Sequence, residues 1–282
     1  MNSYLVAEPQ TDPDATFRNF QRYNVGRAAD HFGATVTGTP SFGWRLRTIG
    51  APVDCRYGAC WLRVASEEPQ WAQGHAWTGN LDGNAITAVH KPRVLDVFEW
   101  PEGDWRNQRA ELMTLMPGEP CSPTDVLRRL PDVSAGWWSA LRQSVDIVAT
   151  IPTERTYADQ TRVTDRIHAR FGDTVEATVT QWATAHSDLH WSNLMRPRFG
   201  ILDWELWGIA PAGTDAATLL CYSLLVPSIA EQVHELFSDA LDTPTGRIAQ
   251  LTVVARLLNR IDGGDYPDLA EPLQQHARTL LD

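Results

Sequence analysis

The sequence predicts an α+β protein of two lobes, with a small β-rich N-terminal lobe and a larger helical C-terminal lobe. β-prone segments separated by Gly/Pro-rich turns fill roughly the first 115 residues. Beyond Pro117 the apolar residues recur at the i, i+3 and i+4 positions that are typical of helices. Strands followed by helices indicate an α+β fold, and 282 residues are enough for two cores. We expect lobes at residues 1–116 and 117–282.

The N-terminal lobe is predicted to contain several strands and one helix. Pro69 suits the first turn of a helix that runs roughly to residue 87. Apolar, turn-bounded segments predict strands over residues 34–39, 44–52, 59–65, 93–100 and 108–116.

The C-terminal lobe is predicted to be helical with one interruption. FGILDWELW, at residues 199–207, has the pattern of a strand or hairpin. Helical spacing predicts helices over residues 122–130, 137–149, 175–184, 215–226, 229–241, 250–261 and 269–281.

Charge and composition narrow the class of protein. The formal net charge of -11 argues against a general nucleic-acid binder, which needs clustered basic residues, and leans toward a cationic partner. No window approaches 18 apolar residues, and Met1 to Asp14 lacks the pattern of a secretion signal. The four cysteines match neither a zinc nor a CxxC spacing. We expect a cytoplasmic monomer or homodimer with reduced cysteines and no membrane partner.

The segment AHSDLHWSNLMRPRFGILDWELW, at residues 185–207, carries the strongest chemical signal. It contains His186, Asp188 and Asn193 as H-x-D-x-x-x-x-N, followed by Asp203 after an apolar run. Phosphoryl transfer needs one carboxylate to take the proton of the acceptor hydroxyl, and a second carboxylate with an amide oxygen to hold magnesium. Asp188 suits the first role, and Asn193 and Asp203 suit the second. The segment therefore predicts a Mg²⁺-dependent phosphotransferase.

This segment resembles the aminoglycoside phosphotransferase and choline kinase group of the kinase-like fold. That group carries an H-G-D-x-H-x-x-N loop and an I-D-W-E strand, and this chain reads H-S-D-L-H-W-S-N and L-D-W-E. Protein kinases have D-F-G at the latter position. The resemblance implies a protein-kinase-like two-lobed fold with Asp188 as catalytic base and Asn193 and Asp203 as magnesium ligands. It also implies structural roles for His186, His190 and Asp215; alternatively, Asp215 is a helix-start carboxylate favoured by the helix dipole.

The resemblance also implies a nucleotide site for ATP or GTP. ELMTLMPG, at residues 111–118, is similar to the hinge strand of this group. By that similarity the backbone of Thr114 and Leu115 meets the nucleotide base, and Met113 packs near it. The family's phosphate-binding lysine corresponds to Arg63 in ACWLRVA, because the only lysine of the chain is Lys91. Arginine also binds phosphate, although the two are not interchangeable.

Two further parts of the nucleotide site are degenerate. Glu68 and Asp82 are candidates for the acid of the small-lobe helix, neither at a convincing spacing. Gly38 to Gly43 (GTPSFG) is either a phosphate loop or a plain turn.

Acceptor-binding residues are the least defined part of the site. Trp191, Trp204 and Trp207 adjoin the loop and are candidates to line an acceptor pocket, although core packing is the better interpretation for most of the tryptophans. The acidic candidates, which also suit a solvated loop, are Glu205, Asp262, Asp265 and Asp268.

The sequence thus predicts a kinase that transfers the γ-phosphoryl group of ATP or GTP to a hydroxyl of a small molecule. The first candidate acceptor is an aminoglycoside or another hydroxylated antibiotic. One alternative is a metabolic kinase for choline, homoserine or a sugar. Another is a catalytically degenerate pseudokinase, which the missing lysine favours and the complete Asp188, Asn193 and Asp203 set disfavours.

Overall fold

The computed structural model describes residues 13–282, which form two compact units. One, here the sheet unit, comprises the described residues up to Trp77 and Arg93–Leu115; the other, the helical unit, comprises Thr78–Pro92 and Met116–Asp282. The predicted change near residue 116 coincides with a unit boundary. However, residues 78–92, which we expected in the first lobe, belong to the helical unit. Most of Met1 to Asp14, for which we predicted no secretion signal, lies outside the described residues.

The sheet unit is built on an antiparallel sheet in the order β1-β3-β4-β6-β5, with β2 beside β3. The strands predicted at 59–65, 93–100 and 108–116 are confirmed. The segment predicted as a strand at 44–52 begins instead as a 3-10 turn with positive φ at Arg45 and Leu46. The strands are β1 (Thr35–Val36), β2 (Ser41–Phe42), β3 (Thr48–Cys55), β4 (Gly58–Glu67), β5 (Val94–Glu102) and β6 (Arg106–Thr114).

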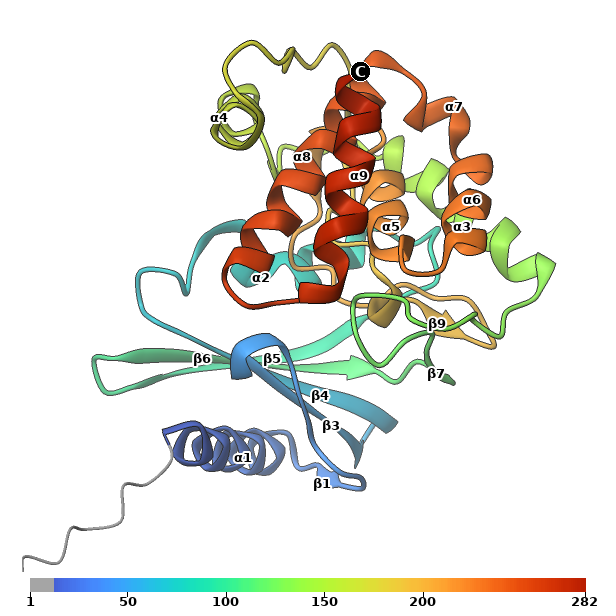
Figure 1. Ribbon diagram of the computed structural model, residues 1–282. Helices are drawn as coiled ribbons and strands as arrows, with labels where there is room; N and C mark the ends of the chain where they lie inside the picture. Colours follow the sequence, from blue (N-terminus) through green and yellow to red (C-terminus); the bar gives the residue numbers. More distant parts are fainter. Residues whose placement is uncertain (1–12) are drawn as a thin grey trace, which may run out of the picture. The chain divides into compact units, whose positions relative to one another are not determined.

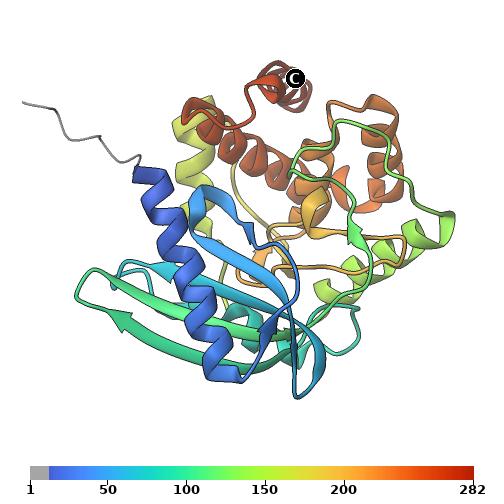
Figure 2. The same cartoon turned by 90° about the horizontal axis from the view of Figure 1, so that it is seen from below.

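Helix α1 (Pro13–Phe32) covers one face of this sheet (Figures 1 and 2). Val25 and Ala28 pack in the same core as Leu62. The sequence did not predict this helix, because its buried face also carries polar groups. One is Asn24, whose amide donates to Gln108 Oε1 at 3.1 Å. Such satisfied buried polar groups blur the apolar periodicity on which the prediction depends.

The helical unit contains the predicted helices at 137–149, 215–226, 229–241, 250–261 and 269–281, with shifted ends. They correspond to α3 (Ala135–Ala149), α5 (Thr214–Ser223), α6 (Pro227–Leu236) with α7 (Ser238–Leu241), α8 (Pro244–Asp262) and α9 (Ala270–Leu281). Two short antiparallel pairs complete the unit: β7 (Glu119–Pro120) with β9 (Met195–Arg196), and β8 (Trp182–Ala185) with β10 (Gly208–Pro211).

Three helix predictions need correction. The helix expected from Pro69 begins only at Gly74, as α2 (Gly74–Asp82). Residues 122–130 are irregular, because the hydroxyls of Ser122 and Thr124 bond the carbonyl of Val126 in a local turn. Residues 175–181 are irregular, and residues 182–184 belong to β8. The helix before them, α4 (Gln160–Phe171), was not predicted, since it buries few apolar side chains.

The core of the helical unit surrounds α5, every residue of which is buried. Large fully buried side chains such as Leu141, Tyr222 and Phe237 fill it. In residues 13–282 no helix is long and apolar enough to cross a membrane. The four cysteines are all free thiols.

Replacing Leu141 by Ala tests the packing of this core. Leu141 is fully buried on α3, so the substitution leaves a cavity, and we expect the free energy of unfolding to fall by about 3 kcal/mol. The exposed Leu130 is the control: Leu130→Ala should change it by less than about 0.5 kcal/mol. Denaturant titration measures both. Equal effects of the two substitutions would contradict the assignment.

Candidate active site

The loop that follows β8, at residues 186–193, leads into a hairpin in which residues 193–194 pair with residues 201–202. The backbone N–H of Leu202 donates to the carbonyl of Asn193 at 2.8 Å, and Leu194 and Ile201 form a β-bridge. Asp203 therefore directly follows the residue that is paired with Asn193. The Asn193 amide also donates to the backbone carbonyl of Asp188 at 3.0 Å. These contacts bring the three residues predicted for catalysis and metal binding together.

Asp188 lies between two basic side chains. Its Oδ2 is 3.3 Å from His190 Nε2, and its Oδ1 is 3.5 Å from Arg256 Nη1 on α8. Burial alone would raise the pKa of Asp188. His190 and, to a smaller extent, Arg256 lower this pKa by more than burial raises it, so the net shift is downward. The carboxylate is 24% exposed and stays ionised at neutral pH. It can therefore accept a proton from a ligand that reaches it.

Asp215 anchors the loop from the first turn of α5. Its two carboxylate oxygens accept the backbone N–H groups of His186 and Ser187, each at 2.8 Å. Burial raises the pKa of Asp215 to about 6, against the lowering effect of these donors. Ser187 is buried with φ of 70°, a conformation that favours glycine, and the resembling motif has glycine there. The contacts support the structural role predicted for Asp215.

The two loop histidines also contact the protein itself. His186 is fully buried, its pKa is lowered to about 4 by burial, and its neutral ring donates from Nε2 to the carbonyl of Leu202 at 2.9 Å. His190 has a raised pKa: burial lowers it, but Asp188 and Asp125 raise it more. Its Nδ1 meets Ser192 Oγ at 3.0 Å. Both rings therefore fix the loop, and His190 also contacts Asp188.

The residues predicted to bind magnesium fit that ion. In the described part of the chain no three His, Cys, Asp or Glu side chains gather as a metal site. Magnesium does not need such a group, because it binds through one or two carboxylates, waters and substrate phosphates. The Asn193 amide nitrogen donates a hydrogen bond to the backbone carbonyl of Asp188, which leaves the amide oxygen for a cation. Asp203, half-buried with φ of 57°, supplies the carboxylate.

Arg63 occupies the middle of β4, where the family's lysine was expected. Its guanidinium pairs with Glu111 at 3.4 Å across the sheet, and Glu111 also binds Arg109 at 2.9 Å. Neither acid predicted from the sequence has this role: Glu68 accepts from Gln70, and Asp82 pairs with Arg155.

Lys91, the only lysine, is buried within the helical unit. Its Nζ donates to the carbonyl of Pro92 and lies 5.3 Å from the ring centroid of Trp204. It does not lie in the strand position from which the family's lysine binds phosphate.

Part of the predicted hinge already forms hydrogen bonds within the sheet unit. The Thr114 N–H donates to the carbonyl of Arg93, and Thr114 Oγ1 accepts from Arg93 N, both at 2.9 Å. Met113 is buried and Leu115 is exposed. Of the predicted backbone contacts to a nucleotide base, the Thr114 N–H is therefore already used.

The glycines of the GTPSFG segment are required for close packing. A Cβ on Gly38 would lie 2.6 Å from Pro52 Cγ, and one on Gly43 would lie 2.1 Å from Thr48 Oγ1. This favours the plain-turn interpretation, because the packing alone explains both glycines.

The tryptophans predicted to contact an acceptor pack into the core instead. Trp191 is fully buried, stacks on Trp137 and donates to Ser223 Oγ at 2.9 Å. Trp204 and Trp207 are also buried, and their Nε1 atoms donate to backbone carbonyls. The acceptor-pocket interpretation of these rings is therefore wrong.

The acidic candidates are mostly paired with arginine. Asp262 pairs with Arg170 at 2.6 Å, Asp265 with Arg260 at 3.1 Å and Asp268 with Arg128 at 2.8 Å. Glu205 is buried, and its backbone carbonyl accepts from Arg155.

The sequence did not indicate Asp125, Arg256, Arg260 or Tyr266, which surround the loop. Asp125 accepts from Ser192 Oγ at 3.1 Å and from the hydroxyl of Tyr266, to which Arg260 also donates at 2.7 Å. The only sequence signal for this set is the i, i+4 spacing of the two arginines, which puts them on one face of α8.

Substituting Ser187 tests the strain in the loop. Because Ser187 has positive φ, Ser187→Gly should raise the free energy of unfolding by about 1 kcal/mol. Ser139→Gly, in the exposed interior of α3, should lower it by about as much. Thermal melting of both variants measures this. Destabilisation by Ser187→Gly would show that the backbone there is unstrained.

Solved structures of small-molecule phosphotransferases share this fold at low sequence identity. Aminoglycoside phosphotransferase APH(4)-Ia matches with a TM-score of 0.59 and 15% identity, over 95% of this chain and 98% of that one. Amicoumacin kinase hAmiN, solved with AMP-PNP, Ca²⁺ and Ami, matches with a TM-score of 0.56 and 11% identity over 96% of each chain. Plasmodium vivax ethanolamine kinase matches with a TM-score of 0.53 and 9% identity, over 97% and 95%.

Comparison by sequence adds nothing to this result. Neither a family model nor a curated protein matches the chain. The architecture nevertheless agrees with the prediction made from residues 185–207, and the α+β class is confirmed. The chain has the kinase-like fold that aminoglycoside phosphotransferases share with the ethanolamine kinase.

Proposed function

We propose that this protein is a small-molecule kinase that transfers the γ-phosphoryl group of ATP or GTP to a hydroxyl group. The observation that carries the proposal is the hairpin pairing of Asn193 with Leu202, which puts Asp203 beside the Asp188 loop. A base and two magnesium ligands on one short segment are what phosphoryl transfer requires. The fold that the chain shares with small-molecule phosphotransferases supports the same class.

In the proposed reaction Asp188 orients the acceptor hydroxyl and takes its proton. The acceptor oxygen forms a bond to the γ-phosphorus, the bond from that phosphorus to the β-phosphate oxygen breaks, and the nucleoside diphosphate leaves. Asn193 and Asp203 would hold magnesium, which neutralises charge on the phosphates when it is bound. His190 and Arg256 orient the Asp188 carboxylate, and Arg63 is the candidate phosphate ligand.

A hydroxylated antibiotic remains one acceptor class, and the names of two structural neighbours, an aminoglycoside phosphotransferase and amicoumacin kinase, agree with it. A metabolic kinase is the second class, to which the ethanolamine kinase belongs. The pseudokinase alternative is less well supported, because the Asp188, Asn193 and Asp203 set is complete and Arg63 has a buried carboxylate partner.

Nucleotide binding is the first test. A ligand at a hundredfold over its Kd adds about 2.7 kcal/mol to the free energy of unfolding, so ATP or GTP with Mg²⁺ should raise the Tm measurably. Asp203→Ala should reduce this Mg²⁺-dependent shift. Asp188→Asn should keep the shift and abolish nucleoside diphosphate release with a working acceptor. Absence of any Mg²⁺-dependent shift with either nucleotide would contradict the proposal.

Arg63 should contribute to nucleotide affinity. Removing a charge-assisted phosphate contact typically costs about 1.5 to 3 kcal/mol, so Arg63→Ala should weaken nucleotide binding about tenfold or more. Arg56→Ala is the control, because Arg56 is an exposed arginine that pairs with Asp96 on the sheet surface. Calorimetric titration with AMP-PNP measures both. Equal affinities for the two variants would remove Arg63 from the nucleotide site.

A further inference from the structure

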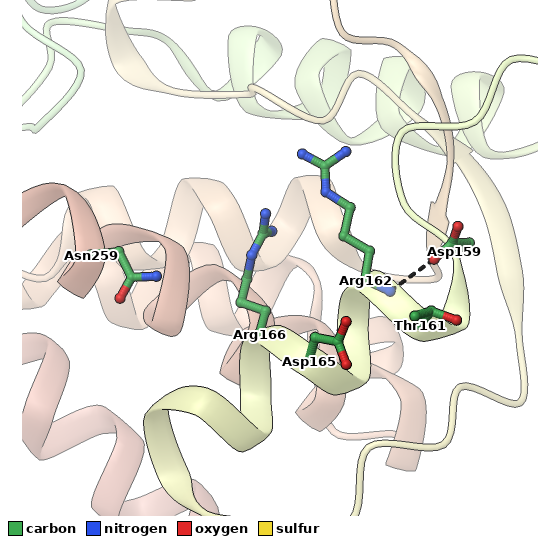
Figure 3. Close-up of a pocket in the computed structure, with 6 residues that line it drawn as sticks. All are labelled: Asp159, Thr161, Arg162, Asp165, Arg166 and Asn259. Carbon is green, nitrogen blue, oxygen red and sulfur yellow. Dashed lines mark hydrogen bonds between the residues drawn. The ribbon is translucent and has the colours of Figure 1, made fainter.

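An open cavity of about 470 Å³ lies between α4 and α8 in the helical unit (Figure 3). Its lining includes two guanidinium groups from α4, of Arg162 and Arg166, and the amide of Asn259 from α8, beside Asp159, Thr161 and Asp165. Figure 3 shows the guanidinium groups of Arg162 and Arg166 pointing to the same side, and the Asn259 amide extending toward Arg166. Donors from two helices therefore converge on one space.

The two guanidinium groups of this cavity are not held in ion pairs by the described part of the chain. Within residues 13–282, no ion pair with a carboxylate is formed by Arg162 or Arg166. Two acids also line the cavity: Asp159 caps α4 by accepting the Arg162 N–H at 2.8 Å, and Asp165 points away from the Arg166 guanidinium in Figure 3. The side on which the arginines converge is thus cationic.

Contacts through Tyr157 connect this cavity with Asp188. Arg256, one turn before Asn259 on α8, donates to the Tyr157 hydroxyl at 3.0 Å and lies 3.5 Å from Asp188. Arg162 donates to the Tyr157 carbonyl at 2.9 Å. Burial lowers the pKa of Arg166, Tyr157 opposes this shift, and the charges of Arg162 and Arg256 add to it, which agrees with the closeness of the three arginines. The buried Nε atom of Arg256 has no hydrogen-bond partner.

We infer that Arg162, Arg166 and Asn259 bind an anionic group of the acceptor, a carboxylate or a phosphate ester, whose hydroxyl then reaches Asp188. The inference rests on the proposed function and names its substrate class: a hydroxylated acid rather than a polyamine such as an aminoglycoside. Guanidinium forks match planar and tetrahedral oxyanions. The acids predicted to bind a cationic acceptor, Asp262, Asp265 and Asp268, are instead each paired with arginine.

The test is anion binding to the full chain without nucleotide. Sodium sulfate is titrated against sodium chloride at equal ionic strength, with Tm as the readout. We expect a saturable rise for the wild type, and about tenfold weaker binding for Arg166→Gln. Arg162→Gln, at an exposed position, repeats the test should Arg166→Gln fold poorly. The matched control is Arg278→Gln on α9, which should respond to sulfate as the wild type does. The Arg278 side chain contacts Gln275.

The acceptor class is tested with three polyols that differ only at one end. D-gluconate ends in a carboxylate, D-glucitol in a hydroxymethyl group and D-glucamine in an ammonium group. Gluconate should displace sulfate, and the other two should not. Equal responses of wild type and Arg166→Gln to sulfate would overturn the inference, as would stabilisation by glucamine that Asp165→Asn removes. Sulfate binding that gluconate cannot displace would overturn the acceptor class.

These arms contain no nucleotide, so their outcome is separate from that of the proposed function. A sulfate response without any shift by ATP or GTP with Mg²⁺ would leave an anion site in a protein that is not a kinase. A nucleotide response with no sulfate response would leave the kinase and overturn only the anionic acceptor.

Discussion

The candidate site depends on a single carboxylate, that of Asp215, which accepts the backbone N–H groups of His186 and Ser187. Hydrogen bonds to a charged group contribute about 1.5 to 3 kcal/mol each, enough to offset a residue held at positive φ. Because α5 is buried along its whole length, the anchor is itself fixed. The conformation of the loop, and with it the direction of Asp188, is therefore set by the core of the helical unit.

The electrostatics of the site follow from the same loop. Asp188 is held between His190, which comes from the loop, and Arg256, which comes from α8. The contact with His190 is set within the loop itself, whereas the contact with Arg256 depends on how α8 packs on α5. A change on α8 can therefore alter the orientation of the Asp188 carboxylate without any change in the loop. This couples Asp188 to the helix that also carries Asn259.

The candidate site could be predicted from residues 185–207 because it is local: Asp188, Asn193, Asp203 and both histidines lie on one segment, which the structure folds into one loop and hairpin. Asp125, Arg256 and Tyr266 could not be predicted, because they are distant from the loop in sequence and only the folding of the chain brings them next to it. Helix α4 was missed for a different reason. Its buried residues are Val163 and Ile167, which are too few to give a clear apolar periodicity in the sequence. Trp191 shows the converse error, since proximity in sequence to Asp188 did not mean exposure to the ligand.

The overall charge of -11 suggested a cationic acceptor, whereas the inference drawn from the cavity between α4 and α8 is an anionic one. Screening limits the reach of distant surface charges to about 10 Å at moderate ionic strength, so net charge says little about a partly buried site. What counts there is which charges have partners. Asp262, Asp265 and Asp268 are each paired with an arginine, whereas Arg162 and Arg166 have no carboxylate partner in the described chain. Local pairing, rather than the sum over the sequence, therefore decides the sign of the group that this surface would accept.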